Sequence, residues 1–291
     1  MKQPDQPLEH FLKQPPPKLP PEDFARLASE RTINVCGRDE TVTLRRDELL
    51  HCYLPIAQAL IEAQAERSDS RLLAGVAGCP GAGKSVFALL LADVTNALLK
   101  NTPKRRAAAA VWPFDGVHHT NAYLESHLVP GTKINLIKRK GRPETFDVEA
   151  AIRICTQLRS LSDEFFLPAY NRRTHDPVEG QIRVTRDDLI VIVEGNFLFM
   201  TAGETWQRLS RLFDIRIFLH AGRDECRDGL IRRHVRGGRS HQDAIGHYET
   251  VDLPNTLLVE QTAAAADIVV ERTSGRIRCG PSQTPRTGST Q

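Results

Sequence analysis

The sequence predicts an α/β fold in which a mostly parallel β-sheet is sandwiched between helices. Short apolar runs alternate with segments of helical periodicity from residue 71 onward, which is the pattern of strand–helix–strand units. The run DLIVIVEGNFLF (188–199) is almost wholly apolar and β-branched, as expected of a strand covered on both faces. The octet GCPGAGKS (78–85) lies between an apolar run and a helical segment, which is the setting of a phosphate-binding loop.

The remaining elements are predicted from the same patterns. A small hairpin is expected over residues 32–46, turning at Gly37-Arg38-Asp39, and a helix over 47–66 follows it with Asp47 as its N-cap. Further strands are predicted at 71–77, 107–115, 165–169, 211–220 and 266–271, and further helices at 85–100, 148–161 and 223–236.

Composition excludes several classes of protein. The chain has 291 residues, of which 40% are hydrophobic and 26% charged, as in ordinary globular proteins. Because the net charge is only +3, nucleic acid is not expected as the main partner. No apolar stretch approaches the roughly 20 residues that cross a bilayer, so no membrane partner is expected. The six cysteines lack metal-site spacing, which favours reduced thiols and a cytoplasmic location.

Phosphate binding would account for the residue types in the octet. A phosphate chain needs backbone N–H groups aimed inward, and Gly78, Gly81 and Gly83 leave room for that approach. Lys84 supplies a positive charge for the terminal phosphates, and the Ser85 hydroxyl can bind magnesium. Chance matches to such a pattern occur, but the strand before and the helix after it favour the functional interpretation. The predicted nucleotide-binding residues are Gly78, Pro80, Gly81, Ala82, Gly83, Lys84, Ser85 and Val86.

Two carboxylates follow predicted strands and are catalytic candidates. Asp115 ends the strand AAAAVWPFD, and strand ends face the ligand crevice of a parallel sheet. It could hold an attacking hydroxyl or accept its proton, although an Asp before Gly is also ordinary turn chemistry. Glu194 closes the strand LIVIVEG, where a buried charge is costly unless it is paired, so it is predicted to bind magnesium together with Ser85.

Two polar segments could complete a phosphoryl-transfer site. In DGLIRRHVRGGRS, Arg232 and Arg236 share a helix face before a glycine pair, as a mobile cationic lid would require. A solvated basic helix is the plainer explanation. The stretch YNRRTHD (170–176) could line an acceptor pocket or could be a surface loop, and His118 has the same ambiguity.

Five motifs in order resemble one family. GCPGAGKS, FDGVHH, KRKGRPETFDV, LPAYNRRTHDPV and VIVEGNFLF are similar to the phosphoribulokinase/uridine kinase superfamily of P-loop kinases, nearest to the branch of bacterial pantothenate kinase and related sugar- or nucleoside-kinase-like proteins. The resemblance covers about residues 45–272. It implies a kinase-type P-loop NTPase fold with a small N-terminal hairpin–helix extension.

The resemblance also implies roles for matched residues. Asp115 would be the base or orienting carboxylate, Glu194 would support magnesium, and Arg232 and Arg236 would belong to the lid over ATP. The catalytic set is then Asp115, Lys84, Glu194, Arg232 and Arg236, and the acceptor-binding set is Asp115, His118, Tyr170, Arg172 and Asn255. Arg172 stands where pantothenate kinases tend to have a histidine, which favours an acceptor with negative charge or many hydroxyls.

Four segments are expected along the chain. Residues 1–22 form a disordered proline-rich N-terminus, 23–70 a hairpin and helix packed on the core, 71–272 the kinase domain, and 273–291 a flexible tail.

The predicted function is an ATP-dependent kinase that uses magnesium and transfers the γ-phosphoryl group to a hydroxyl of a small metabolite, such as a sugar, a nucleoside or a pantothenate-like compound. One alternative is an ATP-binding regulatory protein without turnover, which the joint presence of Asp115, Glu194 and Lys84 disfavours. Another is a partner-coupled ATPase with residues 1–46 as its docking arm. Because relatives often pair, a homodimer stays open.

Overall fold

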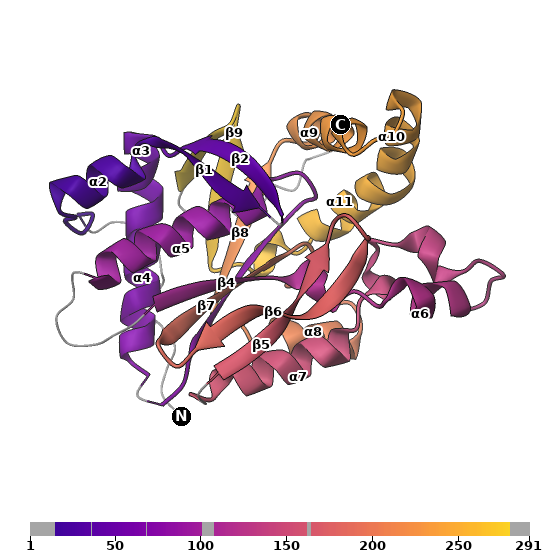
Figure 1. Ribbon diagram of the computed structural model, residues 1–291, viewed down its shortest axis with the longest axis horizontal. Helices are drawn as coiled ribbons and strands as arrows, with labels where there is room; N and C mark the ends of the chain where they lie inside the picture. The colour runs from indigo at the N-terminus through magenta and orange to yellow at the C-terminus, as the bar shows by residue number, and fades with distance from the viewer. Residues whose placement is uncertain (1–14, 36, 68, 101–107, 162–163, 280–291) are drawn as a thin grey trace, which may run out of the picture.

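A six-stranded sheet forms the centre of the molecule. The computed structural model describes residues 15–35, 37–67, 69–100, 108–161 and 164–279. The strand order is β10–β9–β8–β3–β7–β4, with β10 antiparallel to β9 and all other neighbours parallel (Figure 1). This confirms the predicted fold class. The strand bounds are β3 Leu72–Gly78, β4 Ala108–Pro113, β7 Asp188–Gly195, β8 Ile215–Ala221, β9 Ile268–Thr273 and β10 Arg276–Cys279.

Two interior strands, β3 and β7, are covered on both faces. Every residue of β3 is buried, and in β7 only the first residue, Asp188, is not. The apolar runs recognised in the sequence therefore mark interior strands of the sheet, because neither strand has a solvent face that would require polar residues. Flanking helices supply the cover, and their bounds are α4 Leu54–Ala65, α5 Lys84–Lys100 and α7 Val148–Arg159. Helix α8 (Glu204–Ser210) packs against α7.

The predicted N-terminal hairpin is present. Strands β1 (Glu30–Val35) and β2 (Arg38–Thr43) pair antiparallel, with Val35 opposite Arg38 beside the turn. Helix α2 (Pro21–Leu27) precedes them and was not predicted. The predicted helix 47–66 consists of α3 (Arg46–Glu48), a π-helical turn (Leu49–Tyr53) and α4.

Asp47 is not the cap of this helix, contrary to the prediction. The helix begins at Arg46, one residue earlier, and Asp47 lies inside it. The Glu48 carboxylate accepts a hydrogen bond from the backbone N–H of Arg45 at 3.1 Å, which satisfies a free donor at the helix start.

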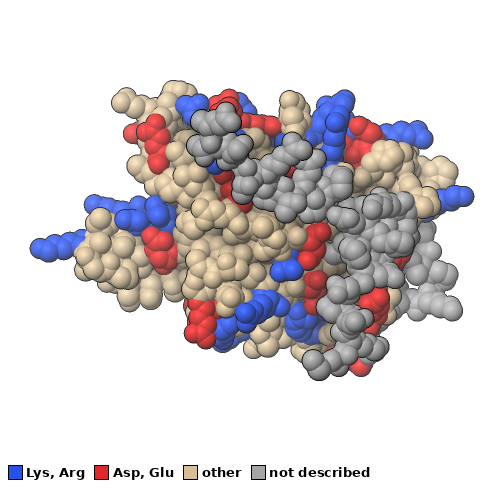
Figure 2. Space-filling view, turned by 180° about the vertical axis from the view of Figure 1, so that it is seen from behind, with Lys and Arg blue, Asp and Glu red and all other residues tan. Residues whose placement is uncertain are grey.

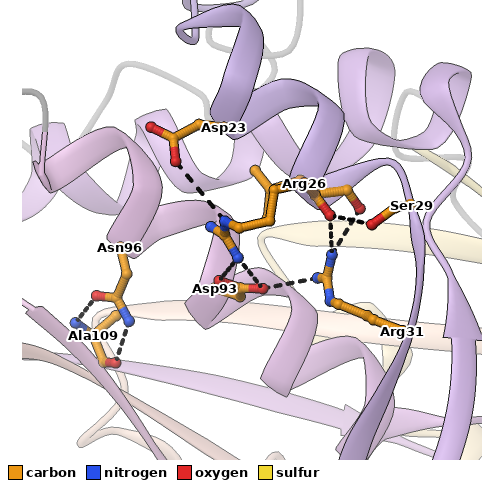
Figure 3. Close-up of polar contacts among 8 residues, drawn as sticks. Asp23, Arg26, Ser29, Arg31, Asp93, Asn96 and Ala109 are labelled. Carbon is orange, nitrogen blue, oxygen red and sulfur yellow. Dashed lines mark hydrogen bonds and ion pairs between the residues drawn. The ribbon is translucent and has the colours of Figure 1, made fainter.

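Ion pairs attach this N-terminal unit to the helix that follows the octet. Asp93 of α5 lies 3.1 Å from Arg26 Nη1 of α2 and 2.8 Å from Arg31 Nη2 of β1 (Figure 3). Arg31 Nη1 also donates to the carbonyl of Leu27 at 2.8 Å. One turn further along α5, the Asn96 side-chain amide donates to the carbonyl of Ala109 in β4 at 3.1 Å and accepts from its backbone N–H at 2.7 Å. Helix α5 therefore joins the hairpin to the sheet.

A second hairpin forms a two-stranded sheet that is not hydrogen-bonded to the main sheet. The predicted strand 165–169 is part of β5 (Glu164–Asn171), which pairs antiparallel with β6 (Asp176–Thr185). Strand β6 was not predicted, because most of its residues are exposed or half-buried and it lacks the apolar alternation that indicates a strand. The segment 170–176, considered as a loop or a pocket wall, forms the turn of this hairpin and the adjoining strand ends.

The last part of the described chain is helical and then returns to the sheet. Helix α9 (Arg223–Arg236) has the predicted bounds, and α10 (His241–His247) and α11 (Leu253–Glu260) follow it at the upper right of Figure 1. His234 Nε2 lies 2.9 Å from Asp252 Oδ2 and joins the end of α9 to the turn before α11. Strand β10 falls in the predicted tail, whose residues 280–291 lie outside the described ones, as do residues 1–14 of the predicted disordered N-terminus.

The surface carries mixed charge. On the face shown in Figure 2, basic and acidic side chains are interspersed among uncharged residues. Of the helices that the structure describes, none is both long and apolar enough to cross a membrane. The five described cysteines are free thiols, four of them buried.

Candidate active site

The octet forms a tight turn between β3 and α5. A methyl group on Gly78 would lie 2.4 Å from the carbonyl oxygen of Leu219 in β8, so only glycine fits there. Gly81 and Gly83 have φ angles of +80° and +95°, a region that other residues rarely adopt. The buried Lys84 ammonium donates to the carbonyl of Cys79 at 2.9 Å across the turn. The loop therefore has the conformation that its sequence requires for close approach to an anion.

Ser85 and Glu194 meet at the carboxyl edge of the sheet. Glu194 is opposite Val76 of β3 and Pro113 of β4 in the strand register, so β7 places it between the two neighbouring strand ends. The Ser85 hydroxyl donates to Glu194 Oε1 at 2.8 Å. A hydroxyl and a carboxylate are oxygen donors of the kind that Mg²⁺ prefers.

Burial and charge set the ionisation of this carboxylate. Glu194 is only 6% exposed, and its burial, together with the nearby negative charge of Asp115, raises the pKa of the Glu194 carboxyl above its ordinary value. Lys84 and the Ser85 hydrogen bond oppose that shift. Burial in turn lowers the pKa of the Lys84 ammonium. A cation placed among these groups would relieve the cost of the buried negative charge.

Asp115 follows β4 in a short 3₁₀ turn, Phe114–Val117. The next residue has to be glycine, because a methyl group on Gly116 would lie 2.3 Å from the carbonyl oxygen of Pro168 in β5. The Asp-Gly pair thus allows close contact between the second hairpin and this turn. Arg172 Nη2 lies 3.4 Å from Asp115 Oδ2.

Asp115 stands among basic side chains. Burial alone would raise the pKa of its carboxyl, but His118 in its protonated form, together with Arg172, Lys84 and Arg233, outweighs burial and holds that pKa below its ordinary value. The side chain is 35% exposed, so it is both ionised and accessible. A carboxylate in this state can accept a hydrogen bond from a hydroxyl group.

A cluster of three rings, His118, Phe146 and Tyr170, packs beside this turn. The His118 ring lies between Phe146, at 3.8 Å between centroids, and Tyr170, at 5.2 Å. Its burial lowers the pKa of His118, and burial raises the pKa of Tyr170 to about 12. Both side chains therefore stay uncharged at neutral pH, and His118 Nδ1 pairs with the Asp115 carbonyl oxygen at 2.9 Å.

A cleft of about 810 Å³ opens above these groups. Ser85 and Glu194 lie in its wall, and so do three other residues predicted for the site, namely Tyr170, Arg172 and Arg236. The strands β5 and β6 form much of one wall. Asp115 reaches the cleft through its contact with Arg172.

Three predicted residues lie elsewhere. Arg232 is exposed and does not line the cleft. Asn255 is 2% exposed and donates to the carbonyl of Gly141 at 2.9 Å, so it fastens the distinctive KGRPETFD loop to α11. Val86 packs against the core through one side of α5.

Other residues at the site were not predicted. Arg233 is half-buried whereas Arg232 is exposed, and burial and the charge of Arg172 lower the pKa of the Arg233 guanidinium. Arg38, at the N-terminal hairpin, lines the cleft. Arg173 lines it as well, and it belongs to the stretch 170–176 that was considered as a possible pocket wall. Arg272 of β9 donates to the carbonyl of Ala82 at 3.3 Å. Helical spacing could have indicated Arg233, because it is three residues from Arg236, but no local signal marks Arg38 or Arg272.

Comparison with known proteins gives the family. No family model matches the chain. The uncharacterized Escherichia coli protein YggC is 32% identical over 245 residues, which are 84% of this chain and 95% of that protein. A pantothenate kinase from a Nocardioides species is 29% identical over 270 residues, covering 86% of this chain and 77% of the relative. A Schizosaccharomyces pombe protein named "putative uridine kinase" is 27% identical, covering 71% of this chain and 85% of its own length.

The fold has matches among solved structures. The "putative fructose transport system kinase" from Silicibacter has a TM-score of 0.62 and 29% identity, and the match covers 71% of this chain and 93% of that one. The chain belongs to the phosphoribulokinase/uridine kinase superfamily of P-loop kinases. The resemblance seen in the five motifs is thereby confirmed. This kinase is a phosphotransferase that acts on a hydroxyl group.

Proposed function

We propose that this kinase transfers the γ-phosphoryl group of ATP to a hydroxyl group of a small metabolite held in the cleft beside β5 and β6. One observation carries the proposal: the 2.8 Å pair of Ser85 and Glu194 lies at the cleft wall, with ionised Asp115 nearby. Phosphoryl transfer needs a nucleotide-phosphate site, a cation and a positioned acceptor hydroxyl in one place, and this edge of the sheet holds residues for all three.

The octet and its lysine bind the nucleotide in this proposal. Backbone N–H groups of residues 78–85 and the Lys84 ammonium hold the phosphates, and Ser85 and Glu194 hold magnesium. When bound, magnesium neutralises charge on the phosphates. Arg233 and Arg236, at the end of α9, add positive charge beside the transferring group.

Asp115 orients the acceptor. Its carboxylate accepts a hydrogen bond from the attacking hydroxyl and takes the proton as the new phosphate ester forms. Tyr170, at the end of β5, and Arg172, in the turn after it, line the cleft and would contact the acceptor. The low pKa of the Asp115 carboxyl makes it a weak base, so most of its effect comes from positioning the hydroxyl in line with the phosphorus.

The test is ADP release from Mg-ATP by the purified protein, with and without hydroxyl compounds: sugars, nucleosides, pantothenate and glycerate. Stimulation by one class, with one phosphorylated product per ADP, supports the proposal. Equal ADP release with and without every compound would instead favour an ATPase. Intact ATP binding without ADP release would favour a regulatory protein.

A further inference from the structure

The N-terminal hairpin forms part of the cleft. Its tip contributes Asn34, Gly37 and Arg38 to the lining, although these residues precede the phosphate loop by about forty positions and lie outside the motifs of the family. The strands β5 and β6 form the facing wall, and the end of α9 contributes Arg236 and Gly237. The cleft is therefore built from three segments that are distant in the sequence.

Three arginines of this lining have no carboxylate partner in the part of the chain that the structure describes. Among the described residues, no ion pair involves Arg38, Arg173 or Arg236. Each belongs to a different one of the three segments. All three side chains are exposed, so their guanidinium groups are accessible to an anion that enters the cavity and can donate charge-assisted hydrogen bonds to it.

The position of Arg38 is fixed from two sides. At the tip, Asn34 Oδ1 accepts from the backbone N–H of Gly37 at 2.9 Å, and Asn34 Nδ2 donates to Asp39 Oδ1 at 2.9 Å. At the base, Arg31 is ion-paired with Asp93 of α5 (Figure 3). The hairpin is thus held against the helix that carries the phosphate loop.

Arg38 also reaches the end of α9. A methyl group on Gly237 would lie 3.9 Å from Arg38 Nη2, so the guanidinium stands beside the last turn of that helix. The positive charge of Arg38 contributes to lowering the pKa of Arg233, after burial and Arg172. The hairpin tip and the helix end therefore form one positively charged rim.

The positively charged rim is placed to bind the acceptor rather than the nucleotide. Of the phosphate-loop residues only Ser85 lines the cleft, and the phosphates of ATP already have the loop N–H groups and Lys84. Arg38 shares the cleft with Tyr170 and Arg173. Apolar side chains between these positions, Leu89, Val111, Val178 and Ile182, suit the carbon skeleton of a small molecule.

We propose that Arg38 and Arg173 form an anion subsite, so that the acceptor of this kinase is a hydroxylated compound bearing a carboxylate or phosphate group away from the reacting hydroxyl. This inference rests on the proposed function and specifies its substrate class. Arg38 is then a specificity-determining residue supplied by a segment outside the kinase motifs. Its planar guanidinium can donate two parallel hydrogen bonds to either anion.

Matched pairs of acceptors test the subsite. Each pair shares a hydroxylated skeleton and differs in the anion: D-glycerate and glycerol, ribose 5-phosphate and ribose, pantothenate and pantothenol. The kinase should have the higher kcat/KM for an anionic member. In Arg38→Gln the KM for that member should rise about tenfold or more, as for loss of a charge-assisted contact, while KM for ATP and KM for the neutral member stay within twofold.

A control variant distinguishes loss of the Arg38 charge from a structural change in the hairpin. Thr41 is an exposed residue of β2 outside the cleft, and Thr41→Ala should leave every constant unchanged. Thermal unfolding verifies that the variants fold, and Arg173→Ala asks the same question if Arg38→Gln does not fold. The carboxylate and phosphate arms show which anion the site takes.

The outcomes distinguish the two proposals. Preference for neutral members, or an equal effect of Arg38→Gln on both members of a pair, overturns the anion subsite and leaves the kinase proposal standing. A rise confined to the KM for ATP assigns Arg38 to the nucleotide and also overturns it. If no pair is phosphorylated although ATP binds, the proposed function fails for these acceptors. Calorimetry with the anionic members and a non-hydrolysable ATP analogue then decides the subsite, and no binding overturns it.

Discussion

Two carboxylates at the sheet edge have opposite ionisation properties. Asp115 keeps a pKa below its ordinary value because positive groups surround it, whereas burial raises the pKa of Glu194. Asp115 therefore carries a stable negative charge beside Arg172, which lines the cleft. The second holds a charge that is costly until a cation arrives. This difference is what a site needs when one carboxylate positions a hydroxyl and the other binds metal.

Replacing Asp115 should separate catalysis from nucleotide binding. In Asp115→Asn the side chain keeps its size but loses the charge that holds the acceptor hydroxyl, so kcat should fall by about 100-fold or more. The dissociation constant of ATP should stay within a few-fold, because the ion pair of Asp115 in the structure is with Arg172 and not with a residue of the phosphate loop. Coupled ADP assays and equilibrium binding of ATP measure the two quantities.

An exposed aspartate provides the control for that experiment. Asp187 lies in the turn between β6 and β7, and Asp187→Asn makes the same chemical change outside the cleft, so kcat should not change. A large loss of ATP affinity in Asp115→Asn would mean that this carboxylate maintains the phosphate loop rather than orients an acceptor.

The spacing of the arginines in α9 does not determine which of them face the site. Arg232 and Arg236 were paired because residues four apart share a helix face, but residues three apart do so as well. The structure turns Arg233 inward and leaves Arg232 exposed. Which of two arginine pairs faces the site depends on how the helix is rotated against its neighbours. Leu230 and Ile231, which are buried against Ala244 and Tyr248, set that rotation.

At the scale of elements, the close contact between β5 and the turn after β4 positions Asp115. Gly116→Ala would place a methyl group 2.3 Å from the carbonyl oxygen of Pro168, and neither backbone can move freely. The free energy of unfolding should fall by about 1–3 kcal/mol, as for overpacked sites, and kcat should fall with it. Urea unfolding and ADP assays measure the two effects.

Gly229 is the matched control for this substitution. It lies in the middle of α9, and a methyl group there would meet no atom within 4 Å. Gly229→Ala should raise the free energy of unfolding by about 0.5–1 kcal/mol, because alanine loses less backbone entropy in a helix. A similar loss of stability in both variants would contradict the contact argument.

The region around α10 should respond to acid. Burial lowers the pKa of His247 from 6.5 to about 4, so this ring is neutral in the folded protein. The unfolded chain takes up a proton below about pH 6.5, and the folded chain does so only near pH 4. Stability should therefore be lost as the pH falls from 6.5 toward 4.

The pH dependence of the melting temperature tests this point. His247→Gln should flatten the decrease between pH 7 and pH 5, because the group that titrates differently is gone. His241→Gln, at an exposed position of the same helix, should leave the decrease unchanged. Equal pH dependence in the wild type and His247→Gln would show that other groups control it.

Elements with strong local patterns could be predicted, and elements fixed by distant contacts could not. The buried strand β7 and the loop–helix unit at 78–100 are recognisable because their residue types follow from burial or backbone shape. Strand β6 is mostly exposed or half-buried, so its sequence lacks a hydrophobic period. The first hairpin was predicted as an element, but its place in the cleft depends on contacts of Arg31 with a helix some sixty residues later.

For the whole molecule, Asp93 is one of the side chains that join the N-terminal helix and hairpin to the kinase core. Asp93 pairs with Arg26 of α2 and Arg31 of β1, while the same helix continues back to the phosphate loop. The hairpin tip and Ser85 then line one cleft. A change at Asp93 should therefore affect the acceptor wall although it lies outside the cleft lining.

Neutralising this side chain tests the connection. In Asp93→Asn both ion pairs weaken, and the free energy of unfolding should fall by roughly 1 kcal/mol or less, because Asp93 is 32% exposed and such pairs are partly screened. KM for the acceptor should rise several-fold, since the hairpin that carries Arg38 is held less firmly, while KM for ATP stays nearly constant. Glu66→Gln, an exposed acid at the end of α4, should change neither constant. An unchanged acceptor KM together with a loss of stability in Asp93→Asn would contradict this prediction. The hairpin would then keep its position without the Asp93 ion pairs, and the apolar contacts of α4 with the core would have to hold the N-terminal segment in place.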